Sequence, residues 1–136
     1  MKKITVSTYK KDKYYPGIVK ATLHILKESD EISPVAILLQ MSNLIPKDYE
    51  SWRRGQVPYL ERVFQGNLAK ANRILRIIGF HAHDLNMVPR QHSYLQKGTN
   101  RPLRFSKTGD DGVETAYSRH FRWNQSQEKK QELFMN

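Results

Sequence analysis

Four prolines in the first half of the chain limit where helices can begin. Proline holds its backbone φ at about −65° and has no N–H to donate, so a first helical turn tolerates it and a helix interior does not. Pro16, Pro34, Pro46 and Pro58 each begin a stretch with apolar residues at helical spacing. The sequence therefore predicts a series of short helices.

Other local signals agree with these helix starts. Ser33 comes directly before Pro34, and a serine hydroxyl is a good N-cap for a helix that ends near residue 43. In residues 46–55 the acids come first and the arginines last, which suits the helix dipole, and Gly55 can end that helix. The first helix is predicted over residues 16–30, with Ile18, Leu26 and their helical neighbours buried.

The stretch from Pro58 to Gly79 is predicted to break at Gly66, with Asn67 capping the helix that follows the break. Helical spacing gives this helix a buried side and a solvent side. The predicted buried side carries Leu68, Ala71, Leu75 and Ile78, and the predicted solvent side carries Lys70, Arg73 and Arg76.

After Gly79 the helical period is lost, and turn formers alternate with aromatic and β-branched residues. We expect a β-hairpin there, with arms near Gln91–Gln96 and Leu103–Lys107 and a loop over residues 97–101. Asp110 is then expected to cap a last helix that ends near Phe121.

These elements predict a mostly α (α+β) fold, a compact helical domain with a helix-turn-helix-like core and a C-terminal β-hairpin. We expect a basic N-terminal arm over residues 1–13, one globular domain over residues 14–123, and a polar, disordered tail over residues 124–136. The order of elements also matches a winged helix, although the helical stretch after Pro58 is longer than an ordinary winged helix allows.

Most of the positive charge lies in one segment of the chain. The formal net charge is +10, and residues 62–107 carry nine lysines and arginines against one acid, Asp84. Because a surface with intermixed charges is the usual solvated state, such a one-sided run indicates a polyanionic partner. We therefore expect non-enzymatic binding to DNA or RNA, a choice that the sequence leaves open.

Two geometries fit this charge. In the first, Arg53 and Arg54 belong to a recognition helix, and the wing contributes the basic residues of the hairpin. In the second, the basic helix side lies beside the hairpin and straddles phosphates as one strip. The expected nucleic-acid-binding residues are Arg53, Arg54, Lys70, Arg73, Arg76, Lys97, Arg101, Arg104 and Lys107.

Two alternatives to non-enzymatic nucleic-acid binding stay open. One is a nuclease that uses histidines, for which His83, His92, His120 and Tyr117 are the candidate catalytic residues. Tyr117 and His120 share a helix side, which suits acid–base chemistry and core packing alike. The other is an adaptor that docks an acidic protein through its basic surface.

Composition excludes several other classes of site. The chain has no cysteine, so disulfides, thiolate catalysis, cysteine zinc sites and iron–sulfur clusters are excluded. No apolar run approaches the roughly 20 residues of a membrane span, and the start lacks the apolar core of a signal peptide. We expect a cytoplasmic protein without membrane, metal or cofactor; the sequence does not set its oligomeric state.

Two short motifs have a simpler interpretation than ligand binding. The segment His81-Ala82-His83-Asp84 contains residue types that bind metals, but its spacing is not specific and we interpret these histidines as packing residues. Residues 106–110, Ser-Lys-Thr-Gly-Asp, are similar to a phosphate-binding turn. We interpret them as a strand-to-helix turn with Asp110 as the cap.

Several motifs together resemble a family of small bacterial proteins without an assigned activity. They are W-R-R-G-x-x-P-Y-L-E at residues 52–61, R-I-L-R at 73–76, F-H-A-H-D-L-N at 80–86, L-R-F-S-K-T-G-D at 103–110 and Y-x-x-H-F at 117–121. The resemblance covers roughly residues 14–123. It implies a compact stand-alone domain and assigns no catalytic residue.

Overall fold

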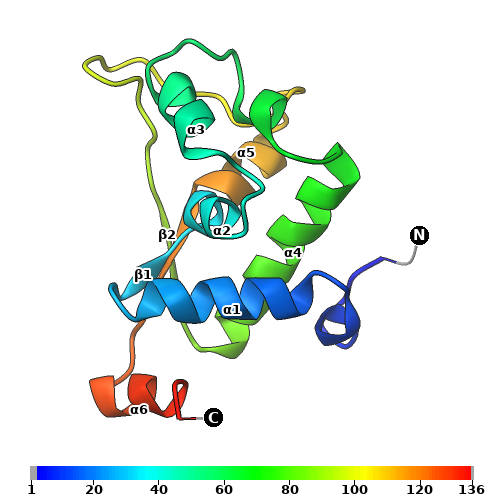
Figure 1. The fold of residues 1–136 in the computed structure, drawn as a ribbon, viewed down its shortest axis with the longest axis vertical. Coiled ribbons are helices and arrows are strands. Elements are labelled where there is room, and N and C mark those ends of the chain that lie inside the picture. Colours follow the sequence, from blue (N-terminus) through cyan, green and yellow to red (C-terminus); the bar gives the residue numbers. More distant parts are fainter. Residues whose placement is uncertain (1–2, 136) are drawn as a thin grey trace.

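The computed structural model describes residues 3–135, and within that range it contains six α-helices and a small antiparallel sheet (Figure 1). The mixed α+β class predicted from sequence is confirmed. The helices are α1 (Tyr15–Leu26), α2 (Pro34–Gln40), α3 (Pro46–Arg53), α4 (Leu68–Asp84), α5 (Asp111–Ser118) and α6 (Gln127–Glu132). The strands are β1 (Glu31–Ile32), β2 (Val88–Gln91) and β3 (Arg119–Arg122), and the 3-10 turns are η1 (Tyr9–Lys11) and η2 (Leu60–Val63).

The proline and cap signals place the helix starts correctly. Proline lies in the first turn of α1, α2 and α3, and the Ser33 hydroxyl accepts a hydrogen bond from the Ala36 N–H at 3.1 Å. The Asn67 side chain accepts one from the Lys70 N–H at 2.8 Å, so the predicted break before α4 is confirmed. Pro58 is the exception, because the short turn η2 follows it instead of an α-helix.

The sheet differs from the predicted hairpin. Its strand order is β1-β3-β2, with β3 in the centre and antiparallel to both neighbours. The predicted hairpin is present only in part and forms no regular ladder: Leu95 and Pro102 form an isolated bridge, and the Leu103 N–H donates to the Tyr94 carbonyl at 2.8 Å. The rest of the second arm pairs with η2, because the N–H groups of Leu60 and Glu61 donate to the carbonyls of Arg104 and Phe105 at 3.1 and 2.9 Å.

The last predicted helix is also too long. Helix α5 ends at Ser118, and residues 119–122 form β3 instead, with His120 and Phe121 buried. A helix that continued to residue 121 would remove the central strand of the sheet, so nonlocal pairing overrides the local helical pattern here.

The core lies among α1 to α5, η2 and the sheet. Its largest fully buried side chains are Trp52, Tyr117, Ile18, Leu26, Ile32, Ile37, Leu38, Leu44, Leu60, Ile74, Ile77 and Ile78. The predicted buried side of α4 is partly wrong, since Leu68 is 40% exposed while Ile74 and Ile77 are fully buried. Among the described residues, no helix is long and apolar enough to cross a membrane.

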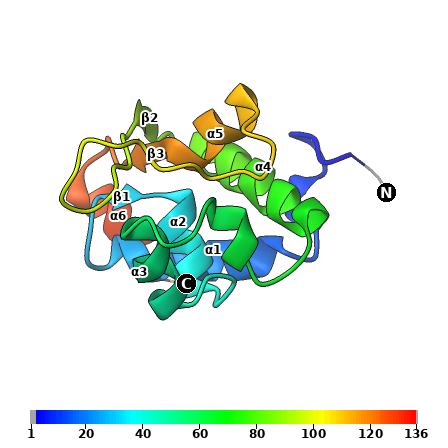
Figure 2. The ribbon, with the colours of Figure 1, turned by 90° about the horizontal axis from the view of Figure 1, so that it is seen from above.

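Both ends of the described chain pack against the domain. Ile4 and Tyr9 are buried, and the Tyr9 ring stacks on Phe80 at 5.4 Å, so the segment predicted as a basic arm is docked from Ile4 onward. The segment predicted as a disordered tail contains α6, where the buried Lys130 ammonium donates to Asp30 at 2.9 Å. Apolar and ionic contacts explain both differences. Figure 2 shows α1, α2 and α3 on one side of the molecule and β2, β3 and α5 on the other.

Candidate functional site

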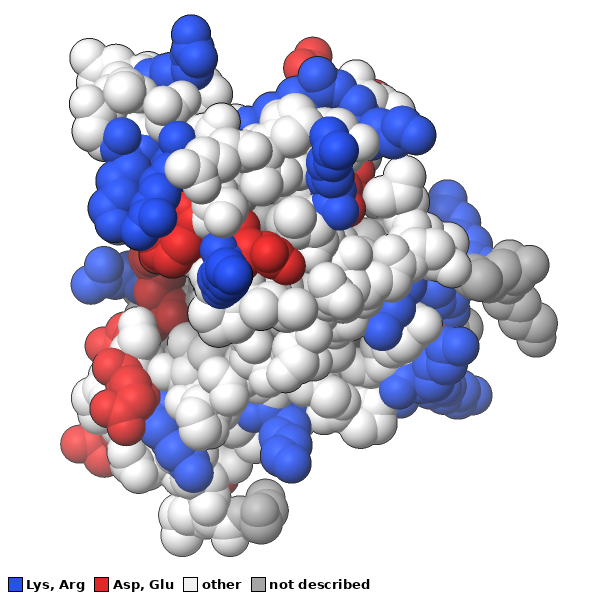
Figure 3. Space-filling view, turned by 45° about the horizontal axis from the view of Figure 1, so that its top comes forward, with Lys and Arg blue, Asp and Glu red and all other residues white. Residues whose placement is uncertain are grey.

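The predicted basic residues fall into separate groups. Lys70, Arg73 and Arg76 lie on α4 beside the N-terminal segment, while Lys97 and Arg101 lie in the loop that follows β2. Figure 3 shows lysines and arginines in several groups, with uncharged surface between them and acids among some of them. The view gives no support to one continuous basic strip.

The α4 group is largely committed to contacts within the protein. Arg73 forms a salt bridge with Asp12, and its side chain is only 21% exposed. The Arg76 Nε donates to the Ile4 carbonyl at 2.9 Å, and the Lys70 ammonium lies 5.3 Å from the Tyr14 ring centre. The prediction of a solvent-facing basic helix side is therefore partly wrong, because the N-terminal segment crosses this side of α4.

A second group forms where the loop of residues 96–101 meets the end of α3. The Lys97 N–H donates to the Arg53 carbonyl at 2.7 Å, and the Lys97 ammonium lies 3.6 Å from the Glu50 carboxylate. Gly55 has φ +79°, and a Cβ there would approach the Gln96 side chain to 2.5 Å. The glycine thus lets the loop sit against the helix end. We call the exposed cations Arg54, Lys97 and Arg101 the α3–loop surface.

Arg53 plays a different role from Arg54. Its guanidinium donates to the Tyr49 hydroxyl at 3.1 Å and lies 6.0 Å from the Tyr94 ring centre. Its Nε is buried and has no hydrogen-bond partner within the described chain. Arg53 is therefore a packed cation behind the surface, and Arg54 is the exposed one.

Arg104 and Lys107 belong to a loop that closes on itself. The Arg104 Nε donates to the Ser106 carbonyl at 2.8 Å, and a second nitrogen of its guanidinium donates to the Lys107 carbonyl. The same guanidinium lies 5.9 Å from the Tyr59 ring centre. Both residues are exposed, but the Arg104 guanidinium is held against its own loop, whereas no such contact holds the Lys107 side chain among the described residues.

Two carboxylates take up the backbone N–H groups of this loop. Glu114 accepts from Phe105 and Ser106 at 2.9 and 2.6 Å, and Glu61 accepts from Lys107 at 2.9 Å. Because these N–H groups already donate to carboxylates, they are not available to bind a phosphate. Asp110 caps α5 by accepting from the Val113 N–H at 3.1 Å. The predicted helix cap at Asp110 is therefore confirmed.

Two of the candidate histidines converge. The rings of His92 and His120 stack at 4.4 Å with an interplanar angle of 11°. His120 Nε2 lies 2.7 Å from the Tyr94 hydroxyl, and its Nδ1 lies 2.9 Å from the Glu31 carboxylate. Both imidazole nitrogens of His120 are thus occupied, while the exposed His92 side chain has no hydrogen-bond partner among the described residues.

Burial shifts two pKa values in this cluster. Partial desolvation, followed by electrostatic interaction with the neighbouring His120, lowers the pKa of His92 below its usual 6.5, so His92 is neutral at neutral pH. Burial raises the pKa of Tyr94 to about 12, which keeps its hydroxyl protonated. The cluster therefore offers one accessible neutral imidazole.

The other two candidates lie outside the cluster. The Tyr117 hydroxyl donates to Glu61 at 2.8 Å, and its ring stacks on Phe105 at 5.3 Å; burial, with the Glu61 charge, raises its pKa. His83 is exposed on α4 and faces a cleft on that side of the helix. Within residues 3–135, no three histidines or acids lie close enough together to hold a metal ion.

Four residues that organise these sites are not predicted from the sequence. Glu61 and Glu114 hold the loop of residues 104–110, and Glu31 and Tyr94 bind the two nitrogens of His120. The position of Glu61 in the motif of residues 52–61 could have indicated an important role. Nothing near Glu31 in the sequence, however, indicates contact with a histidine 89 positions away.

Comparisons with models of protein families, with curated proteins and with solved structures found no match to this chain. The resemblance to a bacterial family stays a prediction. The motifs behind it have a structural explanation, because Trp52 Nε1 donates to the Arg104 carbonyl at 2.8 Å and Glu61 anchors Lys107 and Tyr117.

Proposed function

We propose that this protein binds nucleic acid without chemical turnover and that the α3–loop surface contacts its phosphates. The observation that carries the proposal is the junction between α3 and the loop, where the Lys97 N–H donates to the Arg53 carbonyl. This junction joins exposed cations from two segments that are far apart in sequence. Cations grouped on two adjoining elements suit a polyanion better than isolated surface charges do.

The order of elements supports the same proposal. The chain runs α1, β1, α2, α3 and later β2 and β3, and the sheet order is β1-β3-β2. That is the connectivity expected of a winged helix, in which the third helix reads the major groove and the segment between the last two strands is the wing. Two departures are η2 with α4, inserted after α3, and α5, inserted between β2 and β3.

The proposal differs from the strip predicted from sequence. Arg73 and Arg104 are held by Asp12 and by loop carbonyls, so each would have to break protein contacts to bind phosphate. Arg54 and Arg101 are exposed and have no hydrogen-bond or ion-pair partner from their side chains among the described residues. They carry the expected phosphate contacts, together with Lys97.

The test is the triple variant Arg54→Gln, Lys97→Gln, Arg101→Gln. Binding to labelled duplex DNA, single-stranded DNA and an RNA hairpin is measured by fluorescence anisotropy over a range of salt concentrations. Each lost phosphate contact lowers the slope of log K against log salt by about one. We expect a slope smaller by about two to three for the preferred nucleic acid, and that preference separates DNA from RNA.

A matched control removes the same number of positive charges outside the α3–loop surface. Lys11, Lys20 and Lys27 are exposed, and the triple change of these lysines to glutamine should leave the slope close to that of the wild type. Equal losses in both triples would show a net-charge effect and contradict a defined surface. Absence of binding to every nucleic acid at low salt, with capture of an acidic polypeptide, would instead favour the adaptor alternative.

A second candidate function, nuclease activity, rests on the stacked histidines. His92 and His120 lie beside the Tyr94 hydroxyl and within the field of Arg53, which are residue types that acid–base phosphodiester cleavage uses. Against it, Glu31 and Tyr94 occupy both nitrogens of His120, so one imidazole remains for a substrate. We rank this function second. It requires cleavage of the bound nucleic acid that is lost in His92→Ala while binding is retained.

A further inference from the structure

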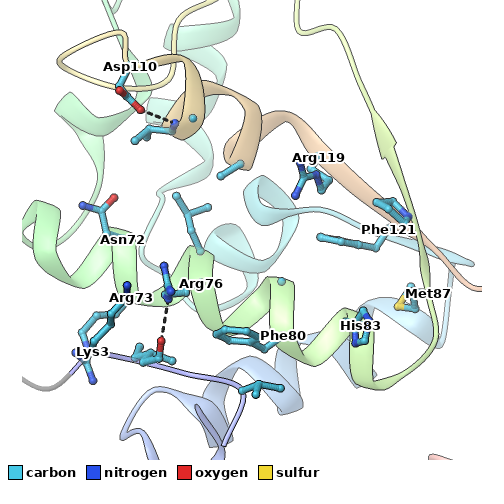
Figure 4. Close-up of a pocket in the computed structure, with 18 residues that line it drawn as sticks. Lys3, Asn72, Arg73, Arg76, Phe80, His83, Met87, Asp110, Arg119 and Phe121 are labelled. Atoms are coloured by element: carbon cyan, nitrogen blue, oxygen red, sulfur yellow. Dashed lines mark hydrogen bonds between the residues drawn. The ribbon is translucent and has the colours of Figure 1, made fainter. Parts of the chain in front are cut away.

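A cleft separate from the α3–loop surface opens beside α4. It is a cleft of about 970 Å³ with walls formed by α4, α5, the sheet and the N-terminal segment (Figure 4). We call it the α4–α5 cleft. The proposed nucleic-acid contacts do not use it, because none of Arg54, Lys97 and Arg101 lines it.

The lining of the cleft is mainly apolar. Leu75 and Phe80 come from α4, Val113 and Ala116 from α5, and Phe121 from β3. Val6, on the N-terminal segment, is 72% exposed at the cleft. Apolar area of this kind, open to water, is suited to the apolar part of a ligand.

The polar groups of the cleft are mostly cations. Arg119 and Lys3 line it, and neither side chain has a hydrogen-bond or ion-pair partner among the described residues. Arg76, on the wall opposite Arg119, uses its Nε for the Ile4 carbonyl (Figure 4). Among the described lining residues the one acid, Asp110, already accepts from the Val113 N–H. The charge of the cleft is thus complementary to an anion.

Gly79 helps to keep the cleft open. It lies inside α4, where glycine weakens a helix relative to alanine, and a Cβ built on it meets no atom within 4 Å. Its backbone φ is not in the left-handed region, so the helix itself does not require glycine there. Glycine at this position therefore leaves space in the cleft, although the backbone conformation would accept other residues.

We propose that the α4–α5 cleft binds a small amphipathic anion, with an apolar body on Leu75, Phe80 and Val113 and one carboxylate, phosphate or sulfate group near Arg119. Its volume lies within the roughly 300–1,000 Å³ of small-ligand pockets. A standard protein partner would bury about 800 Å² of this protein and would need a broader surface than this cleft. The proposal does not rest on the proposed nucleic-acid binding.

The probes are decanoate and decyl phosphate, with decyltrimethylammonium as the cation of equal chain length, all below their micelle concentrations. Isothermal titration calorimetry gives the affinities, and amide chemical shifts locate the binding. We expect the two anions to bind with shift changes in α4, α5 and β3, and the cation to bind at least tenfold more weakly. Arg119→Gln should weaken both anions about tenfold, the effect of one charge-assisted hydrogen bond.

Gly79→Leu fills the cleft while it favours the helix, so this variant should fold and lose binding of both anions. Arg90→Gln is the matched control, because Arg90 lies on the neighbouring strand β2 outside the cleft lining; it should bind as the wild type does. Equal affinity for the anions and the cation, or full binding by the folded Gly79→Leu variant, would overturn the proposal. So would an acidic peptide that binds the cleft when neither anion does, since that result would assign the surface to a protein partner.

Discussion

The loop of residues 104–110 and the α4–α5 cleft use polar groups in opposite ways. In the loop, Glu114 and Glu61 accept the N–H groups of Phe105, Ser106 and Lys107. In the cleft, the side chains of Arg119 and Lys3 have no hydrogen-bond or ion-pair partner among the described residues. A buried polar group that is fully paired stabilises one conformation, whereas an unpaired cation on an apolar surface is available to a ligand.

This difference changes how the sequence motifs are interpreted. The residues of the densest motifs, at 52–61 and 103–110, form hydrogen bonds with each other. Trp52 Nε1 donates to the Arg104 carbonyl, and Glu61 accepts from the Lys107 N–H. They are thus explained by the fold alone. Arg119 lies outside the most basic segment of the chain, and only its place in the cleft makes it notable.

The largest predicted effect comes from breaking the loop. Glu61→Ala removes the acceptor of the Lys107 N–H and of the buried Tyr117 hydroxyl. Because buried donors left without a partner are costly, the free energy of unfolding should fall by about 3 kcal/mol. Urea denaturation followed by circular dichroism measures the change.

The control for this prediction is the exposed acid Glu28, whose change to alanine should alter stability by less than about 0.5 kcal/mol. Glu61→Gln should lie between the two, since an amide keeps one acceptor oxygen. A Glu61→Ala protein as stable as the Glu28→Ala protein would mean that the loop does not depend on its carboxylates, and the contrast with the cleft would fail.

Local signals account for what the sequence predicts of this fold. Ser33 and Asn67 cap their helices because the cap and the N–H that it accepts are three residues apart. The sheet was not predictable in this way, because β1 has two residues and pairs with β3 about 90 positions later. The docking of the N-terminal segment likewise depends on Arg73 meeting Asp12, 61 positions away, so the exposure of the basic helix side was mispredicted.

An intermediate loss of stability is expected when the contact between Asp12 and Arg73, which holds the N-terminal segment against α4, is removed. Burial alone would raise the pKa of Asp12, but the Tyr14 N–H and Arg73 stabilise its charge and hold the pKa below the usual 3.8. Asp12→Asn should therefore lower the free energy of unfolding at pH 7 by about 1 to 2 kcal/mol.

The pH dependence separates this contact from simple packing. Because the folded-state pKa of Asp12 is lowered, its contribution is complete above about pH 4 and is lost as the pH falls through the folded value. The stability difference between wild type and Asp12→Asn should thus shrink in strongly acidic solution. A difference that stays constant from about pH 7 to about pH 2 would contradict the ionic contact, and the cleft wall would then depend on the burial of Ile4 and Tyr9 and on the Arg76 hydrogen bond to the Ile4 carbonyl.

The smallest predicted effect is a gain in stability at Gly79. The change to alanine adds a methyl group where no atom lies within 4 Å and removes a helix-interior glycine, so the free energy of unfolding should rise by about 0.5 to 1 kcal/mol. Gly66→Ala is the opposite case, because φ is +139° there and a Cβ would meet the Phe64 ring at 2.9 Å; it should destabilise. Thermal unfolding compares the two. A stabilised Gly79→Ala protein that binds decanoate less well would show that the cleft is maintained at the expense of helix stability, as expected of a binding site and not of a packing defect.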